Sequence, residues 1–327
     1  MTDDQLLNDA RRGDESAFEV LAARHRRELY AHCYRMLGSV QDAEDAVQES
    51  LLAAWRGLAG FAGRSSLRTW LFQVTTNACL RLSAKRPRRM LSFEHGPAFT
   101  QTSDLGQPVT GPVWLEPWPD EPVDDEPDPA AAYLRRESVE LAFVAALQHL
   151  PGTQRAVLIL RDVLGFSAAE AAEILDTTPA SVNSAMQRAR ATVDQRMPKR
   201  SQQAELATLG TDGQRELVDA FVEAWERADV DALLELLTED AQFTMPPLPA
   251  WFDGRENIRK FVTERMFATP WRLVPIEANG QPAFACHQYD GEQYRLGAVN
   301  VLSVRDGRIC WIAGFVDPAV TRYFAKS

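Results

Sequence analysis

The chain of 327 residues is poor in cysteine, with only Cys33, Cys79, Cys286 and Cys310. These four are too few and too widely spaced for a disulfide framework or a Cys-x-x-Cys metal site. The sequence also has no apolar run of the roughly twenty residues that a membrane span requires. Its first residues, MTDDQLLNDARRGD, are polar and acidic, unlike a targeting segment. We therefore expect a soluble cytoplasmic protein without a membrane anchor, a metal site or a cofactor.

Positive charge is scarce as well, because 35 Lys and Arg residues against 46 Asp and Glu residues give a net charge of −11. Such a total argues against nucleic-acid binding, but the charges are unevenly distributed. Residues 1–90 carry 14 basic and 11 acidic side chains, and residues 135–200 carry nine and seven. Residues 91–134 contain nine acids and no base, and residues 201–327 contain 12 bases and 19 acids. Two mildly basic modules are thus separated by an acidic segment and followed by an acidic domain.

Residues 42–89, DAEDAVQESLLAAWRGLAGFAGRSSLRTWLFQVTTNACLRLSAKRPRR, predict two amphipathic helices joined by a Gly/Ser turn. Apolar residues recur every three or four positions in each half, as on the buried stripe of a helix. A basic tail closes the stretch. Residues 3–37 predict two further helices, with Gly38 as a C-cap, so an all-α unit should extend to about residue 85.

The segments DAEDAVQES and FAGRSSLRTWLFQVTTNACLR resemble conserved region 2 of the extracytoplasmic-function (ECF) sigma factors, the promoter-recognition subunits of bacterial RNA polymerase. The resemblance implies that the first of the two helices docks on the clamp coiled coil of core polymerase. It implies that the loop 61–67 and the second helix face promoter DNA. The residues that it assigns to the polymerase contact are Asp42, Asp45, Gln48, Glu49 and Leu52.

Promoter opening requires a basic groove that follows phosphates and a pocket that accepts an unstacked base. Small residues in the turn allow close backbone approach, and Asn77 offers an amide to a base edge. Trp70 could stack on a base, but its place on the apolar stripe favours a core role. The predicted region 2 DNA contacts are Arg64, Ser65, Arg68, Asn77, Arg81, Lys85 and Arg86.

Residues 136–197 predict a second helical module, in which Pro151 and Gly152 interrupt an amphipathic helix and the last two helices have helix-turn-helix spacing. Ser167 is a predicted N-cap, and Pro179 should open the recognition helix. The exposed face of that helix mixes groups suited to base edges and phosphates in a major groove. Its predicted contacts are Thr178, Pro179, Ser181, Asn183, Ser184, Gln187, Arg188 and Arg190, with Val182 and Met186 facing inward. Following the first module, this one resembles sigma region 4, which adds the polymerase flap as an implied partner.

Residues 90–135 predict a linker, because eight of the 19 prolines and no lysine or arginine fall in 91–134. Within it, WLEPWPDE at 114–121 is either a local Pro/Trp cluster or a docking motif. A similar motif occurs in sigma factors with an extra C-terminal domain, so we favour docking. The proposed regulatory residues are Trp114, Leu115, Glu116, Pro117 and Trp118. A separate hypothesis is that Asp124, Asp125 and Glu126 mimic nucleic acid in the polymerase active-site channel.

After a polar break, the last third predicts helices, a strand around residues 241–245, a helix from Arg255 and then alternating strands. Asp306 and Gly307 between apolar runs predict a hairpin. This order implies an α+β cone. The pattern LLTEDAQFTMPP…W…GRENI resembles the SnoaL-like members of the nuclear transport factor 2 superfamily, and the whole chain resembles sigma factors of the actinobacterial SigG type.

Cones of this kind enclose a pocket, and some relatives are isomerases or cyclases with an Asp or His base. The candidates here are Asp240, His287, Tyr289 and Asp317. No pair has a spacing that predicts convergence, so we assign no catalytic residue and expect no enzymatic activity. We favour a regulatory module that senses a small molecule in its pocket or holds the DNA-binding modules. The DGGG stretch and NPDKL-like tail of a related subgroup are absent, so its mechanism is not carried over.

The sequence thus predicts a multidomain protein with two all-α sigma modules, a region 2 helical bundle and a region 4 helix-turn-helix, followed by a cone-shaped α+β SnoaL-like domain. We predict a sigma factor that binds core polymerase and directs promoter-specific initiation, regulated by its C-terminal domain. Two alternatives remain: a cyclase- or isomerase-like enzyme with a DNA-targeting region, and a helix-turn-helix repressor. The expected boundaries are 1–89 for region 2, 90–135 for the linker, 136–200 for region 4, 201–212 for a second linker and 213–327 for the SnoaL-like domain.

Overall fold

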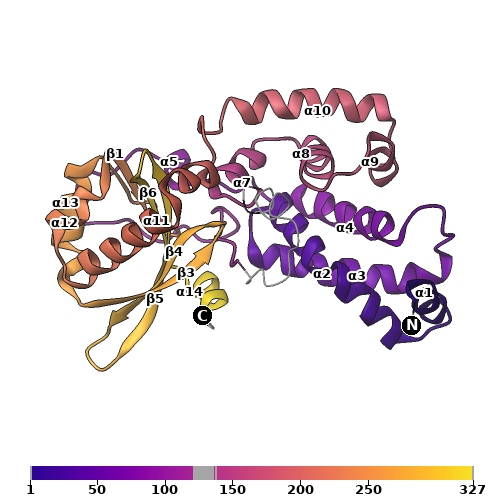
Figure 1. Cartoon of the computed structure of the whole chain (residues 1–327), viewed down its shortest axis with the longest axis horizontal. Helices are drawn as coiled ribbons and strands as arrows, with labels where there is room; N and C mark the ends of the chain where they lie inside the picture. The colour runs from indigo at the N-terminus through magenta and orange to yellow at the C-terminus, as the bar shows by residue number, and fades with distance from the viewer. Residues whose placement is uncertain (1, 121–135, 137, 326–327) are drawn as a thin grey trace. The chain divides into compact units, whose positions relative to one another are not determined.

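The computed structural model describes residues 2–120, 136 and 138–325 (Figure 1). The chain divides into two compact units, each built from two stretches of sequence. The first unit combines Met1–Arg89 with Val144–Arg196, and the second combines Met90–Phe143 with Met197–Ser327.

The first stretch of the first unit is a helical bundle. Its helices are α1 (Asp3–Arg11), α2 (Glu15–Leu37), α3 (Val40–Gly57) and α4 (Leu67–Ser83), with a 3-10 turn at Leu58–Gly60. Gly38 ends α2 with φ 67°, as predicted. Ser39 begins α3 by accepting the amide of Asp42 at 3.1 Å. Trp70 is half-buried and packs on Phe61 with ring centroids 5.0 Å apart, in agreement with a core role.

The second stretch carries the helix-turn-helix. Helix α7 (Leu141–Gln148) begins in the last residues of Met90–Phe143 and continues into this stretch. It is followed by α8 (Gly152–Leu158), a π-helical turn (Ile159–Val163), α9 (Ala168–Ile174) and α10 (Pro179–Asp194). Ser167 caps α9 in a capping box with Glu170, and Pro179 opens α10, as predicted. Val182 and Met186 are buried, also as predicted.

A buried arginine joins the two stretches of the first unit. Arg155 on α8 is 7% exposed, and its guanidinium donates to the carbonyls of Met36, Gln148 and Leu150, the last at 3.2 Å. Burial lowers the pKa of Arg155 to about 10, so the side chain stays charged at neutral pH. Its donors therefore satisfy carbonyls at the end of α2 and between α7 and α8.

The second unit contains a six-stranded sheet with the order β2-β1-β6-β5-β4-β3. The strands are β1 (Leu237–Thr244), β2 (Trp251–Asp253), β3 (Trp271–Ala278), β4 (Gln281–Tyr289), β5 (Tyr294–Arg305) and β6 (Arg308–Phe315). β1 is parallel to β6, and the other neighbours are antiparallel. Asp306 and Gly307, with φ of 52° and 76°, form the predicted hairpin turn.

Helices cover one face of this sheet (Figure 1). They are α11 (Gln202–Glu226), α12 (Val230–Glu235) and α13 (Arg255–Glu264). The short α14 (Pro318–Thr321) follows the last strand. Aromatic rings fill the space between helices and sheet. Phe221 stacks on Phe284 and Phe252 on Phe261, with centroids 4.8 and 4.5 Å apart, and all four are at most 2% exposed. These rings belong to a packed core between the helices and the sheet.

Most of the expected linker belongs to the second unit. The short helix α5 (Ser92–His95) carries Phe93, whose ring lies edge-on to Trp251 and Trp311 at 6.2 and 5.8 Å. The amide of Phe99 donates to the carbonyl of Trp251 at 2.7 Å. A proline-rich segment without regular structure can bury its apolar side chains against a sheet. The local composition did not indicate this packing.

The second expected linker, residues 201–212, is also structured. Residues from Gln202 onward form the first turns of α11, and Leu206 is 7% exposed. Gly210, with φ 68° and ψ 174°, breaks the helix at the point where the sequence shows a polar interruption. The interruption is therefore a kink inside α11 rather than a connection between domains.

The buried His32 on α2 predicts acid sensitivity of the first unit. Burial and the charge of Arg35 lower the pKa of His32 from 6.5 to about 3. The pKa of His32 is lower in the folded state than in the unfolded state, so the unfolded chain binds the proton first as the pH falls. The contribution of neutral His32 to the free energy of unfolding is therefore complete above pH 6.5 and is lost as the pH falls toward 3. The free energy of unfolding should fall by up to about 1.4 kcal/mol per pH unit in this window. We expect His32→Gln to remove this slope in urea unfolding followed by circular dichroism, and equal slopes in variant and wild type would contradict the prediction.

Candidate nucleic-acid interface

The recognition helix presents its whole predicted contact surface. The eight residues predicted for region 4 lie on α10 or at its N-cap, and all of them are exposed. The opposite face of α10 is apolar and packs on α8 and α9. Thr178 begins the helix by accepting the amide of Ser181 at 3.2 Å. Arg190 pairs with Asp162 on the neighbouring turn at 2.6 Å, whereas Arg188 forms no ion pair with any of the described residues. The contact face of this helix is therefore open to solvent, although Arg190 would have to leave Asp162 to meet a phosphate.

The predicted region 2 contacts divide into two groups. Arg64, Asn77, Arg81 and Lys85 are exposed, whereas Ser65, Arg68 and Arg86 are half-buried. Asn77 and Arg81 lie one turn apart on α4, so both reach the same side of the helix. Arg81 makes only a 3.5 Å ion pair with Glu49, and both side chains are more than half exposed.

Arg68 is held inside the first unit. Its Nε donates to Glu28 at 3.0 Å, and its guanidinium also forms an ion pair with the second carboxylate oxygen. The same group donates to the carbonyl of Leu164 at 3.3 Å and lies 4.2 Å from the ring centroid of Phe166. Glu28 is on α2 and Phe166 precedes α9. Part of the α4 surface is therefore covered by the helix-turn-helix stretch.

Among the predicted polymerase contacts, Asp42 behaves differently from the rest. Asp45, Gln48, Glu49 and Leu52 are exposed, and Leu52 is 57% exposed. The side chain of Asp42 is 6% exposed and accepts from Arg86 and, at 2.5 Å, from Arg89. In this arrangement Asp42 anchors the basic tail instead of facing a partner. The sequence could not indicate this, because the two arginines lie more than 40 positions away.

A groove of about 370 Å³ runs beside Leu52 on the same face. Its floor is apolar, and its rim is charged. The lining residues are Glu15, Phe18, Glu19, Ala22, Ala23, Arg26, Leu51, Leu52 and Trp55. An apolar groove with a charged rim is the usual anatomy of a surface that accepts a partner helix.

The tryptophan motif is built into the second unit. Trp114, Leu115 and Trp118 are each at most 8% exposed, Pro117 is buried and Glu116 is half-buried. The backbone amide of Trp118 donates to the side-chain oxygen of Asn279 at 2.8 Å. The backbone amide of Asn279 donates in turn to the carbonyl of Trp118 at 2.9 Å. Asp124, Asp125 and Glu126, the residues of the mimicry hypothesis, lie outside the described residues.

The candidate catalytic residues do not meet. Asp240 on β1 pairs with Arg305, which lowers the pKa of Asp240. His287 and Tyr289 are on β4, three strands away from β1 in the sheet order, which is about 14 Å at the usual strand spacing. Asp317 caps α14 by accepting the amide of Ala319 at 2.9 Å. Within the described part of the chain, no group of three or more His, Cys, Asp or Glu side chains could hold a metal ion. None of the described helices is long and apolar enough to cross a bilayer.

Three family descriptions match the chain in succession: Sigma-70 region 2 at residues 21–89, Sigma-70 region 4 at 140–193 and a SnoaL-like domain at 218–312. The ECF RNA polymerase sigma factor SigG of Mycobacterium tuberculosis is 41% identical over 322 residues, covering 94% of this chain and 83% of SigG. The RNA polymerase sigma-H factor of Pseudomonas aeruginosa is 29% identical over 192 residues, covering 59% of this chain and 92% of that protein.

The crystal structure of the extracytoplasmic-function sigma factor SigJ of Mycobacterium tuberculosis resembles the chain with a TM-score of 0.59 at 22% identity. The match covers 93% of this chain and 98% of SigJ. The two chains therefore share a fold along almost their whole length, including the sheet-containing domain.

Asp42 and Asp45 form a matched pair for testing the two roles on α3. We expect Asp42→Asn to lower the free energy of unfolding by about 3 kcal/mol, because it removes the buried carboxylate that pairs with Arg86 and Arg89. Asp45→Asn removes the same charge from an exposed position and should change the stability by less than about 0.5 kcal/mol. Urea unfolding of both variants measures the difference, and equal losses would show that Asp42 is not an internal anchor.

Proposed function

This chain belongs to the ECF sigma factor family and directs transcription initiation, and from that premise we propose how its parts share the work. The observation that carries the proposal is the recognition helix α10, whose apolar side is buried and whose eight predicted contact residues are all exposed. We propose that these residues bind duplex DNA in a major groove at one end of the promoter. The loop 61–67 and Asn77 then meet the unpaired strand at the other end, with Arg64, Arg81 and Lys85 on phosphates.

Core RNA polymerase is the partner proposed for α3. Asp45, Gln48, Glu49 and Leu52 would contact the clamp coiled coil, and the apolar groove beside Leu52 would receive part of it. Region 4 would contact the flap. Two DNA-binding modules on one polymerase surface need only modest affinity each, since the first contact raises the effective concentration of the second. The site of action would be the bacterial cytoplasm, where core polymerase works.

For the C-terminal domain we propose regulation without catalysis. The dispersed acid and base candidates and the aromatic core of the cone support this. If regulation involves a small molecule, we propose a groove outside the cone as its place, about 510 Å³ in volume between α11 and the β3–β4 turn. Leu206, Val218 and Ile276 line it. Its charged walls are Arg215 and the ion pair of Arg136 with Glu277. This composition fits an apolar molecule with one acidic group.

The decisive experiment is run-off transcription from genomic fragments with core polymerase, comparing the full chain with residues 1–200. If the chain acts as a sigma factor, we expect promoter-specific initiation that requires both the chain and core polymerase. A helix-turn-helix repressor would bind duplex DNA without core polymerase and start no transcript. An enzyme with a DNA-targeting region would give no promoter-specific initiation with either protein.

Two substitutions on α10 separate base recognition from phosphate contact. We expect Asn183→Ala to cost about 1–3 kcal/mol of discrimination at one base pair, because a base-edge contact is lost. Arg188→Ala should weaken binding to all DNA sequences alike. It should also reduce, by about one, the slope of the logarithm of the binding constant against the logarithm of the salt concentration. Gln195→Ala, an exposed change beyond the end of α10, is the control. Promoter binding by the holoenzyme, measured by fluorescence anisotropy over a salt series, gives all three values, and identical salt slopes would contradict the assignment of Arg188.

The pair between Glu28 and Arg68 should compete with DNA for the same guanidinium. We expect Glu28→Gln to free Arg68 for a phosphate and to tighten holoenzyme binding to promoter DNA about fivefold, or about 1 kcal/mol for a partly exposed pair. Glu173→Gln changes the net charge equally at an exposed position on α9 and serves as the control. Equal affinities of the two variants would mean that the pair does not restrain Arg68.

A further inference from the structure

The two chain segments that bound the helix-turn-helix stretch meet at one place in the second unit, on the β3–β4 turn. Residues 139–141 lead into the helix-turn-helix stretch Val144–Arg196, and residues 202–205 follow it. Five buried polar side chains hold both segments there, and we call this group the clasp. Its members are Glu140, Gln202, Gln203, Asn279 and Gln281, each at most 9% exposed.

Glu140 joins the incoming segment to the outgoing one. Its side chain is fully buried, and its two carboxylate oxygens accept the amides of Gln202 and Gln203 at 3.0 and 2.8 Å. These amides are the first two of α11, where helix N–H groups have no partner within the helix and the dipole favours negative charge. The carboxylate is thus stabilised in the interior by the start of α11, and the start of α11 is fixed by the carboxylate.

Three amide side chains then attach both segments to the sheet. Gln281 accepts the amide of Leu141 at 3.0 Å and donates to the carbonyl of Leu302 at 2.8 Å. Asn279 donates to the carbonyl of Val139 at 2.6 Å. Gln202 bonds the backbone of Val304 in both directions, at 2.6 and 3.1 Å.

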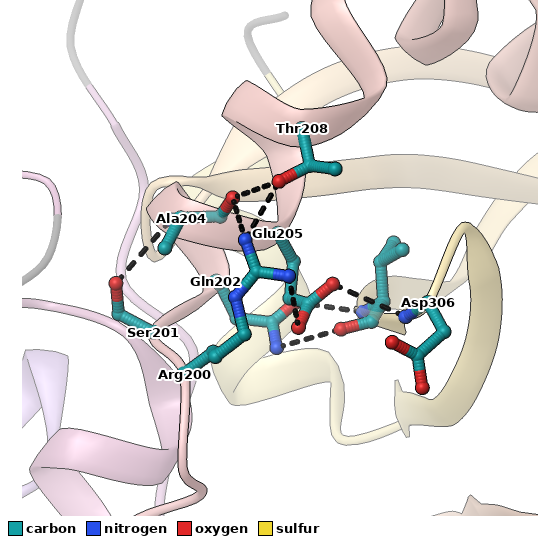
Figure 2. Close-up of polar contacts among 8 residues, drawn as sticks. Arg200, Ser201, Gln202, Ala204, Glu205, Thr208 and Asp306 are labelled. Carbon is teal, nitrogen blue, oxygen red and sulfur yellow. Dashed lines mark hydrogen bonds and ion pairs between the residues drawn. The ribbon is translucent and has the colours of Figure 1, made fainter.

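Figure 2 shows how the first turns of α11 are fastened on the other side. Arg200 reaches over the helix to the carbonyl of Ala204 and the hydroxyl of Thr208, at 3.1 and 2.7 Å. It also forms a 3.5 Å ion pair with Glu205, whose carboxylate accepts the amide of Asp306 in the β5–β6 turn at 3.1 Å. The outgoing segment therefore contacts the strand ends at two places.

The clasp leaves little free chain on either side of region 4. The helix-turn-helix stretch of the first unit begins at Val144, three residues after Leu141, and three residues span at most about 10 Å. It ends at Arg196, six residues before Gln202, a span of at most about 20 Å. With the clasp closed, both ends of region 4 are tied to one turn of the C-terminal sheet.

We propose that the clasp residues are positioning residues for promoter recognition: they tie region 4 to the C-terminal domain and so restrict the distance between the two promoter elements that one polymerase can engage. The inference rests on the proposed function and assigns the C-terminal domain a specific part in it. Opening the clasp releases residues 139–141 from the sheet and so lengthens the tether that precedes the helix-turn-helix stretch. A longer tether lowers the effective concentration of region 4 at its promoter element when the spacing is optimal. It also lets region 4 reach elements at other spacings.

The test compares Glu140→Gln with Glu277→Gln in the full chain. A glutamine at position 140 has one acceptor oxygen for two amides, so one of the two bonds is lost. Glu277 is on β3 next to the same turn, but its 3.8 Å pair with Arg136 is exposed, which makes it a matched control. Run-off transcription with core polymerase is measured on templates whose spacer between the two promoter elements is changed by up to two base pairs, about 7 Å.

We expect the wild type and Glu277→Gln to show one sharp optimum. For Glu140→Gln, transcription at the outer spacings relative to the optimum should rise at least about threefold. Hydrogen exchange should show the amides of Gln202 and Gln203 opening at least about tenfold faster in this variant. Gly280→Ala is the second variant, because Gly280 has φ +64° and an added Cβ would lie 2.9 Å from the carbonyl oxygen of Arg136. Gly280→Ala should broaden the dependence of transcription on spacer length in the same way. It serves as the test if Glu140→Gln does not fold.

Faster amide exchange with an unchanged spacer profile would overturn the proposal, and so would unchanged exchange in Glu140→Gln. Failure of the proposed function looks different. In that case the wild type gives no promoter-specific transcript at any spacing, while the exchange measurement still reports on the clasp.

Discussion

A buried carboxylate at the start of α11 is the constraint on which the arrangement of the second unit depends. An ionised group can remain in a protein interior only if hydrogen-bond donors replace the water that it loses. For Glu140 those donors are two backbone amides about 60 positions further along the chain. Region 4 lies between Glu140 and these amides in the sequence. It is therefore an insertion within the sequence of the second unit. The second unit thus includes residues on both sides of the helix-turn-helix.

The first unit uses the same physical device with the opposite charge. Arg155 is buried and donates to main-chain carbonyls of α2 and of the α7–α8 connection. Because carbonyl groups at helix ends lack partners within the helix, one guanidinium can satisfy several of them. Packing between α4 and the helix-turn-helix stretch, with Arg68 over Phe166, adds to this link. Regions 2 and 4 thus form one unit although a long segment separates them in sequence.

Local signals in the sequence predicted local structure well. Gly38, Ser167, Pro179 and the Asp306-Gly307 turn were all identified from residue type and position, because caps and turns depend on a few neighbouring residues. The exposed face of α10 followed from its apolar stripe. Features that depend on distant partners were missed. Asp42 is buried by arginines from the basic tail, and Trp118 is held by Asn279, 161 positions away. Composition alone made residues 90–120 look like a spacer, since its pairing partners are strands formed by the last third of the chain.

The late position of those strands has a consequence for biosynthesis. Residues 90–120 leave the ribosome long before the β3–β4 turn and the strands that bury them have been made. At translation rates of about 5–20 residues per second, the delay between Trp118 and Asn279 is roughly ten to thirty seconds. Region 2 is complete and able to fold early in that interval, whereas the tryptophan segment has no permanent partner until translation is nearly finished. A nascent or truncated chain that ends before the sheet therefore exposes Trp114, Leu115 and Trp118, and chaperones and proteases act on such apolar segments.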